Sequence, residues 1–184
     1  MPPKTYTWIS LWFLLTAPII AWDISYCLMR PRSMEGGDLH WFWAPAFGFY
    51  SQIDHLYNVS TYKKGDGFPN AHAILNLVET IMNLLYIYAA HVVAWPPAPL
   101  IGFTAAAMTV AKTFLYWSQE YFCGWCMVGH NSLVDIVKYW FLSSVPWVIV
   151  PSLILMRLGK DLVSELKYAD QLSAVDDASS RKRR

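Results

Sequence analysis

Glu79 is an ionisable residue inside the hydrophobic segment 71–93. Asn76, Asn83 and Tyr86 recur around it at helical spacing, which places them on the same face of one helix. A charged side chain within a bilayer costs about 3 kcal/mol by insertion scales, so it normally faces the protein interior and marks a functional site. We therefore expect Glu79 to belong to a polar site inside a membrane protein.

Other apolar segments bring polar residues toward the same depth. Asp23 lies near the end of the first segment, and Tyr139 lies near the start of the fourth. On the third, Lys112, Tyr116 and Gln119 follow i, i+4, i+7 spacing and share one stripe. Because consecutive spans alternate in direction, all these groups fall within one half of the bilayer. We expect them to meet there.

The chemistry of such a site follows from its carboxyl groups. In an apolar pocket a carboxyl group favours its protonated form, because desolvation penalises the charge. Asp23 and Glu79 could then divide the acid and base roles of one reaction. Nearby aromatic rings would stabilise a carbocation or a cationic ligand by cation–π attraction. The rings in question are those of Tyr86, Tyr116, Tyr139 and Trp147.

Two simpler interpretations stay open. Asn76, Asn83 and Gln119 could serve only as hydrogen-bonding groups between membrane helices, each contributing about 0.6 kcal/mol. Lys112 could form an ion pair with Glu79 or with Asp23 and so neutralise it.

The elements that must position these residues are hydrophobic helices. Of 184 residues, 55% are hydrophobic and only 15% are charged, which is outside the range of ordinary soluble proteins. Segments of roughly 20 apolar residues span a bilayer, and four are present, at 8–28, 71–94, 100–116 and 133–156. The expected fold is all-α, a polytopic membrane four-helix bundle over residues 1–160, followed by a basic cytoplasmic tail at 161–184.

The ends of the chain indicate its topology. Segment 8–28 carries Asp23, and no small-residue cleavage pattern follows it, so we expect an uncleaved span rather than a signal peptide. Lys4 and the basic tail predict that both termini are cytoplasmic. The final residues 181–184 are similar to an endoplasmic reticulum retrieval signal, which favours a multi-pass protein of that membrane. A nucleic-acid partner is not expected.

Residues 30–70 form the long connection between the first two spans. They are rich in Trp, Phe and Tyr and are interrupted by Gly and Pro, which predicts an aromatic lumenal loop lying at the membrane interface. The loop contains Asn58-Val-Ser60, a glycosylation acceptor that is usable only on the lumenal side.

Cys123-Gly-Trp-Cys126 has the spacing of a redox pair or of half a zinc site. The thioredoxin-like setting and the further ligands of a zinc site are missing, so a structural disulfide or two free thiols are favoured. Cys27 is expected to be a packing residue. The sequence contains no glycine-rich phosphate loop and no H-E-x-x-H motif, and we expect no cofactor and no metal.

An ordered set of motifs resembles the EXPERA family, which includes sterol Δ8–Δ7 isomerases and sigma-2-like amine receptors. The matching pieces, between residues 17 and 156, are Trp22-Asp-Ile-Ser-Tyr26, Tyr62-Lys-Lys-Gly-Asp-Gly-Phe68, Leu77-Val-Glu-Thr80, Gly129-His-Asn131 and the segment 139–151. The resemblance implies acids at Asp23 and Glu79 and a cation-stabilising ring at Trp147. Ile19, Met82 and Ser144 depart from the family pattern, where a histidine, a threonine and an asparagine are expected.

Because the acids remain while their polar surroundings differ, we expect a related reaction. The prediction is a cofactor-independent isomerase or cyclase that protonates a double bond of a sterol or terpenoid ligand. The alternative is a non-catalytic, sigma-2-like binder of sterols or amines, and a homodimer stays open. With Asp23 and Glu79 catalytic, the predicted substrate-binding residues are Asn76, Asn83, Tyr86, Tyr116, Gln119, Tyr139, Ser144 and Trp147.

Overall fold

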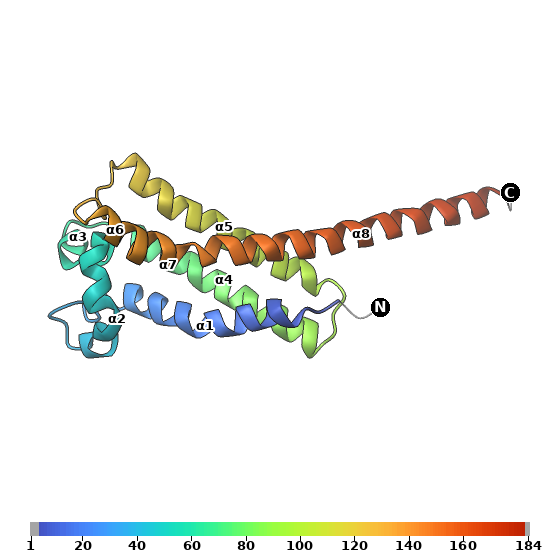
Figure 1. The fold of residues 1–184 in the computed structure, drawn as a ribbon. Coiled ribbons are helices and arrows are strands. Elements are labelled where there is room, and N and C mark those ends of the chain that lie inside the picture. Colours follow the sequence, from blue (N-terminus) through green and yellow to red (C-terminus); the bar gives the residue numbers. More distant parts are fainter. Residues whose placement is uncertain (1–3, 183–184) are drawn as a thin grey trace.

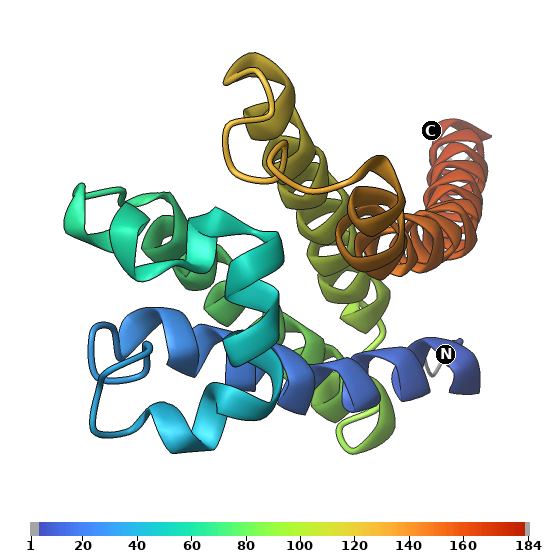
Figure 2. The ribbon, with the colours of Figure 1, turned by 60° about the vertical axis from the view of Figure 1, so that its left-hand side comes forward.

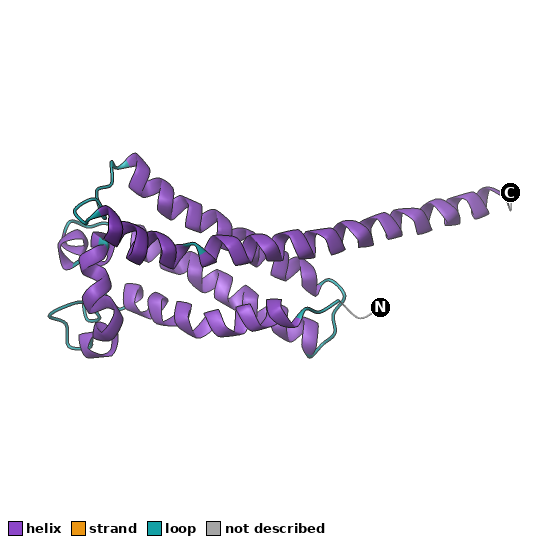
Figure 3. Cartoon of the chain, viewed as in Figure 1, coloured by secondary structure: helices purple, strands orange, loops and turns teal. Residues whose placement is uncertain are grey.

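Four long helical runs dominate the computed structural model, which describes the backbone of residues 4–182 and the side chains of residues 4–174. Each run is long and apolar enough to cross a membrane. They are α1 (Thr7–Leu28), α4 (Phe68–His91), α5 (Ala98–Phe122) and a run that starts at Leu133 and continues into α8 (Pro146–Lys182). Within the described backbone no residue is in a strand, so the expected all-α class with four candidate spans is confirmed (Figure 3).

The long helices run back and forth along one axis (Figure 1). The chain enters and leaves at the same end of the bundle, which we call the terminal end, and α4 and α5 are joined there by a short turn. The opposite end, which we call the cap end, carries residues 29–67 and the connection 123–132. Figure 2 shows the cap segment, coloured from light blue to turquoise, gathered beside the ends of α1 and α4. An even number of long helical runs explains why α1 starts and α8 leaves the bundle at the same end.

The segment expected to be an aromatic loop is largely helical, which corrects that expectation. It forms α2 (His40–Ile53), η1 (His55–Tyr57) and α3 (Val59–Lys63). Proline was expected to break regular structure, yet Pro45 lies inside α2. The reason is burial: aromatic side chains of α2 and η1 pack on the end of α1, and Phe47 stacks on Tyr26 with ring centroids 3.8 Å apart. Aromatic packing of this kind stabilises a short helix whose local sequence is unfavourable.

The helices pack tightly at the terminal end. Phe13 of α1 lies edge-on against Tyr86 of α4, with centroids 5.4 Å apart, and Leu158 of α8 belongs to the same buried cluster. Gly102 of α5 makes this close approach possible, because a Cβ atom there would lie 2.8 Å from the Tyr86 ring and 3.1 Å from Leu158. Tyr86 of α4, Gly102 of α5 and Leu158 of α8 therefore pack closely at this end, and Phe13 brings α1 into the same cluster.

The fourth helical run is irregular in the half nearer the cap. α6 (Leu133–Asp135) leads into a π-helical stretch, η2 (Ile136–Phe141), then α7 (Leu142–Ser144) and finally α8, which begins at Pro146. Pro146 has no backbone N–H to donate to the preceding turn, and α8 starts at this residue. The irregular stretch borders the cavity described below, a setting in which π-helical turns are common.

α8 continues past residue 160 without interruption and extends beyond the rest of the bundle (Figure 1). The predicted domain boundary at 160/161 therefore does not coincide with the end of an element. Asp161 on this helix is buried against the first residues of the chain, where it accepts a 2.6 Å hydrogen bond from Tyr6. The side chains of the basic end, 181–184, lie outside the described residues.

Candidate functional site

A cavity of about 500 Å³ lies in the cap half of the bundle. This is a volume typical of small-molecule sites, and its walls come from α1, α2, α4, α5 and the fourth helical run. Most of the wall is apolar or aromatic. Its polar side chains include Asp23, His72, Asn76, Lys112, Tyr50 and Tyr116.

A chain of buried polar contacts lies along one side of the cavity. The Asn76 amide nitrogen donates to an oxygen of Asp23 at 3.1 Å, and its carbonyl oxygen accepts a hydrogen bond from Lys112. The Lys112 Nζ lies 2.8 Å from the Glu79 Oε2. Asn76 and Glu79 are each only 2% exposed, and Lys112 is 7% exposed. Three helices, α1, α4 and α5, are thus joined through four polar side chains.

The two predicted acids differ in their surroundings. Glu79 is paired directly with Lys112 and does not line the cavity, so the alternative in which Lys112 neutralises Glu79 matches this geometry. Asp23 does line the cavity, and the ion pairs found among the described side chains do not include it. Its polar contact is the neutral amide of Asn76. Of the two carboxyl groups, only that of Asp23 can touch a bound molecule.

The structure brings six of the ten predicted site residues together on the cavity wall: Asp23, Asn76, Tyr116, Tyr139, Ser144 and Trp147. It places the other four, Glu79, Asn83, Tyr86 and Gln119, away from that wall. Helical spacing fixes which residues share a face of a helix, but not how far along the bundle each one lies. Tyr86, for example, is ten residues beyond Asn76 and therefore about 15 Å further along the helix, in the packed core of the terminal end.

Aromatic rings are fixed in the wall by their own neighbours. Trp147 packs edge-on against Trp12 with centroids 5.5 Å apart, and Tyr139 packs edge-on against Phe49 at 5.0 Å. The Ser144 hydroxyl accepts a 2.9 Å hydrogen bond from the Trp117 indole and bonds back to its own helix, so it is already satisfied. The wall is therefore preformed, and its rings are held where a developing positive charge could be stabilised.

A third acidic residue, which sequence reasoning missed, lies behind the cavity at the cap end. Asp54 directly follows α2 and is 1% exposed. Its carboxylate accepts hydrogen bonds from the Tyr116 hydroxyl and, at 2.9 Å, from the backbone N–H of Leu56. Burial raises the pKa of Asp54 to about 6, although the bond from Tyr116 acts in the opposite direction. The cap segment has no single helical period, so no spacing pattern could have linked Asp54 to Tyr116.

The Tyr116 hydroxyl is the centre of a further hydrogen-bond cluster. The Trp140 indole donates to it at 2.6 Å, and the Tyr50 hydroxyl lies 3.2 Å from it. Tyr50 and Tyr116 line the cavity, whereas Trp140 and Asp54 stand behind them. The cluster joins α2, α5 and η2.

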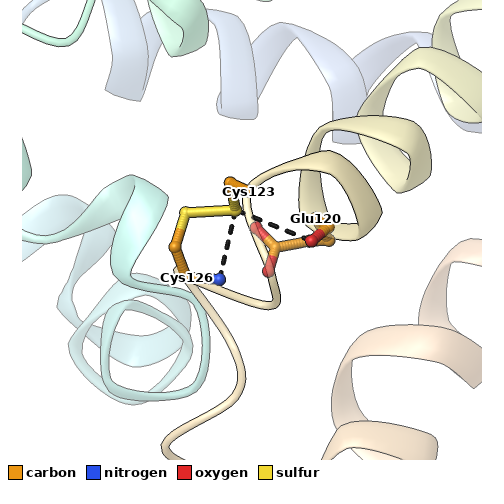
Figure 4. Close-up of side chains that lie close together, drawn as sticks. All are labelled: Glu120, Cys123 and Cys126. Atoms are coloured by element: carbon orange, nitrogen blue, oxygen red, sulfur yellow. Dashed lines mark hydrogen bonds between the residues drawn. A yellow bond between two sulfur atoms is a disulfide. The ribbon is translucent and has the colours of Figure 1, made fainter.

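Cys123 and Cys126 form a disulfide in the connection between α5 and α6 (Figure 4). Sequence analysis left a disulfide or two free thiols open, and the structure has the disulfide. Glu120 lies close to both sulfur atoms, but its carboxylate accepts the backbone N–H groups of Met127 and Val128 at 3.3 Å each. The disulfide and these hydrogen bonds hold the connection in place, and neither Cys123 nor Cys126 has a free thiolate in this state. Cys27 is buried in the aromatic cluster, as expected.

Comparison of the chain with family models, with curated proteins and with solved structures gave no match.

Proposed function

We propose that this protein is a membrane-embedded isomerase or cyclase that protonates a double bond of a sterol or another isoprenoid. The observation that carries the proposal is the Asp23 carboxyl group, which opens onto a preformed, aromatic-walled cavity of about 500 Å³. The motif set that resembles the EXPERA family supports the same reaction class. The ligand must be largely apolar, because the wall is.

Asp23 is the proton donor in this mechanism. Its carboxyl proton is transferred to one alkene carbon, the π electrons form the new C–H bond, and the neighbouring carbon becomes a carbocation. Trp147 and Tyr139 stabilise that cation through their ring faces. The Asp23 carboxylate then removes a proton from the carbon on the other side of the cationic carbon. The electrons of that C–H bond form the shifted double bond, and the acid is regenerated. In a cyclisation, a second double bond attacks the cation before the proton is lost.

Asn76, Lys112 and Glu79 position the acid. Asn76 fixes the orientation of Asp23, and the Lys112 ammonium stabilises the carboxylate that remains after proton transfer. Glu79 holds Lys112 in place through the ion pair. Residues of this kind act by keeping the reacting group in a productive geometry.

The membrane setting that we propose is the endoplasmic reticulum, with both termini in the cytoplasm. The positive residues near the two termini support this orientation. The cavity would then lie in the lumenal half of the bilayer, and substrate would reach it from the lipid phase.

A second candidate function is non-catalytic binding of an amine ligand, as in sigma-2-like receptors. Asp23 favours it, because this carboxyl group faces the cavity and has no ion-pair partner among the described side chains. An ammonium group of a ligand could take that place.

The test is incubation of the purified full chain in lipid nanodiscs with Δ8-sterol and terpenoid alkene substrates in D₂O. Catalysis predicts product with a shifted double bond or new ring that contains deuterium, and loss of that product in Asp23→Asn. Asp161→Asn is a matched control, since Asp161 is a buried carboxyl remote from the cavity. Tritiated amine binding that depends on Asp23, with no deuterated product from any substrate, would establish the receptor and overturn the enzyme.

A further inference from the structure

We propose that the cap wall of the cavity is a recognition site for a ligand hydroxyl group, in which the phenolic oxygen of Tyr50 is held as a hydrogen-bond acceptor by Tyr116 and Asp54. The inference rests on the proposed function, since it assumes an isoprenoid in the cavity. It narrows the ligand to an isoprenoid alcohol and predicts which end of that alcohol points toward the cap.

Trp140 and Asp54 stand behind the cavity wall, and both form hydrogen bonds with the Tyr116 hydroxyl. The indole N–H of Trp140 can only donate, and it donates to the Tyr116 oxygen at 2.6 Å. An ionised Asp54 can only accept, and it accepts the single proton of the Tyr116 hydroxyl. Asp54 is 1% exposed and Trp140 is 3% exposed, so solvent does not compete for either contact.

The partners of Tyr116 determine which hydroxyl donates in the hydrogen bond between Tyr50 and Tyr116. With its proton given to Asp54 and one lone pair taken by Trp140, the Tyr116 oxygen has one lone pair remaining. The Tyr50 hydroxyl, 3.2 Å away, therefore has to donate its own proton to Tyr116. The distance between the two oxygens alone is compatible with either tyrosine as the donor. The fixed partners behind Tyr116 decide the direction.

The direction of this hydrogen bond makes the site prefer an alcohol over a carbonyl ligand. Tyr50 lines the cavity, and once its proton is committed, its oxygen offers only lone pairs to the cavity. A ligand hydroxyl can donate to it, whereas a ketone or aldehyde oxygen would place lone pairs against lone pairs. Sites built around a fixed hydrogen-bonding partner discriminate strongly against an analogue that lacks the complementary group.

The same geometry orients the ligand. Tyr50 belongs to α2 at the cap, and Asp23 lies on α1, so the hydroxyl site and the proton donor come from two different elements of one cavity wall. A ligand anchored by its hydroxyl group at Tyr50 would extend from the cap toward Asp23. The double bond to be protonated must therefore be separated from the hydroxyl-bearing carbon.

The test compares matched alcohol and carbonyl ligands on the full chain in nanodiscs at pH 7.5. Two pairs serve as probes: a Δ8-3β-hydroxysterol with its 3-ketone, and farnesol with farnesal, each measured by competition against the tritiated alcohol. We expect the alcohol of each pair to bind at least about tenfold more tightly, which corresponds to one hydrogen bond of about 1.4 kcal/mol. Tyr50→Phe should reduce the ratio to near one.

Two further variants separate recognition from general damage. Thr113→Val removes another hydroxyl from the same cavity wall, one that donates to the Thr109 carbonyl, and should leave the alcohol-to-carbonyl ratio unchanged. Asp54→Asn supplies an amide that can donate to Tyr116. Tyr116 would then donate to Tyr50, and Tyr50 would donate to the ligand, which favours the carbonyl ligand.

Equal affinities in the unmodified protein, or an unchanged ratio in Tyr50→Phe, would overturn the inference while leaving the proposed reaction standing. If none of the four probes binds, the inference and the proposed isoprenoid site fall together.

Discussion

The Nζ of Lys112 lies 2.8 Å from the Oε2 of Glu79, and both side chains are almost completely buried. This ion pair withdraws Glu79 from the cavity and leaves one carboxyl group, that of Asp23, exposed to a ligand. In the proposed mechanism, Asp23 is therefore the acid that reacts, and Glu79 positions its neighbours.

Asp23→Asn is expected to reduce turnover of an alkene substrate by at least about 100-fold, because an amide cannot serve as a general acid. The fold should persist, since an asparagine can still bond to Asn76. Product formation by gas chromatography and thermal unfolding in detergent would measure the two effects. Turnover near that of the unmodified protein would exclude Asp23 as the proton donor.

Glu79→Gln should destabilise the protein by about 3–5 kcal/mol, because it leaves the buried Lys112 charge without its partner. Glu79→Gln combined with Lys112→Met should recover most of that loss, since the double variant contains no unpaired charge there. Chemical unfolding of the double variant and of both single variants, Glu79→Gln and Lys112→Met, in detergent gives the coupling energy. Purely additive losses would mean that the ion pair does not contribute as the structure indicates.

Ligand selectivity is expected to change with pH around the pKa of Asp54, which is about 6. Above that pH the carboxylate accepts the Tyr116 proton, and the alcohol is preferred. Below it, protonated Asp54 can donate to Tyr116, Tyr116 can donate to Tyr50, and a carbonyl ligand becomes acceptable. The other titratable groups near Asp54 are Glu120, the imidazole of the adjacent His55, and the phenols of Tyr50, Tyr57 and Tyr116. The phenols stay neutral over this range, because a tyrosine ordinarily ionises only near about pH 10.

The measurement is the alcohol-to-carbonyl affinity ratio between pH 5 and pH 8. The ratio should fall as the pH is lowered through about 6. Asp54→Asn serves as the control, because it has no titrating group at this position and its ratio should not vary. A ratio that changes equally in Asp54→Asn would assign the effect to another group.

Gly102→Ala should lower the thermal stability of the bundle, because its Cβ would lie 2.8 Å from the Tyr86 ring. Overpacking of this kind usually costs about 1–3 kcal/mol. In a Tyr86→Leu background the smaller side chain leaves room, and the added penalty of Gly102→Ala should be smaller. Gly48→Ala is a suitable control, because a Cβ atom added at Gly48 would meet no neighbouring atom within 4 Å.

Much of the architecture could be predicted from particular residues. The apolar segments around Glu79 and Asp23 are long enough to span a bilayer, and that length sets the number of spans. The polar stripe containing Lys112 and Tyr116 was also predicted, because helical periodicity fixes which residues share a face. Asp54 could not be predicted, since its contact with Tyr116 depends on how the cap segment folds back over the bundle.

Hydrophobic length and residue type are local properties, so the amino-acid sequence alone predicts four helices that are long and apolar enough to cross a membrane and that carry acidic and aromatic side chains. The three-dimensional arrangement of the helices was needed to show that Lys112 pairs with Glu79, that Asp23 faces the cavity and that Asp54 contacts Tyr116. These contacts depend on the rotation and depth of each helix against its neighbours. Side-chain packing across the whole bundle sets those quantities, and no single segment encodes them.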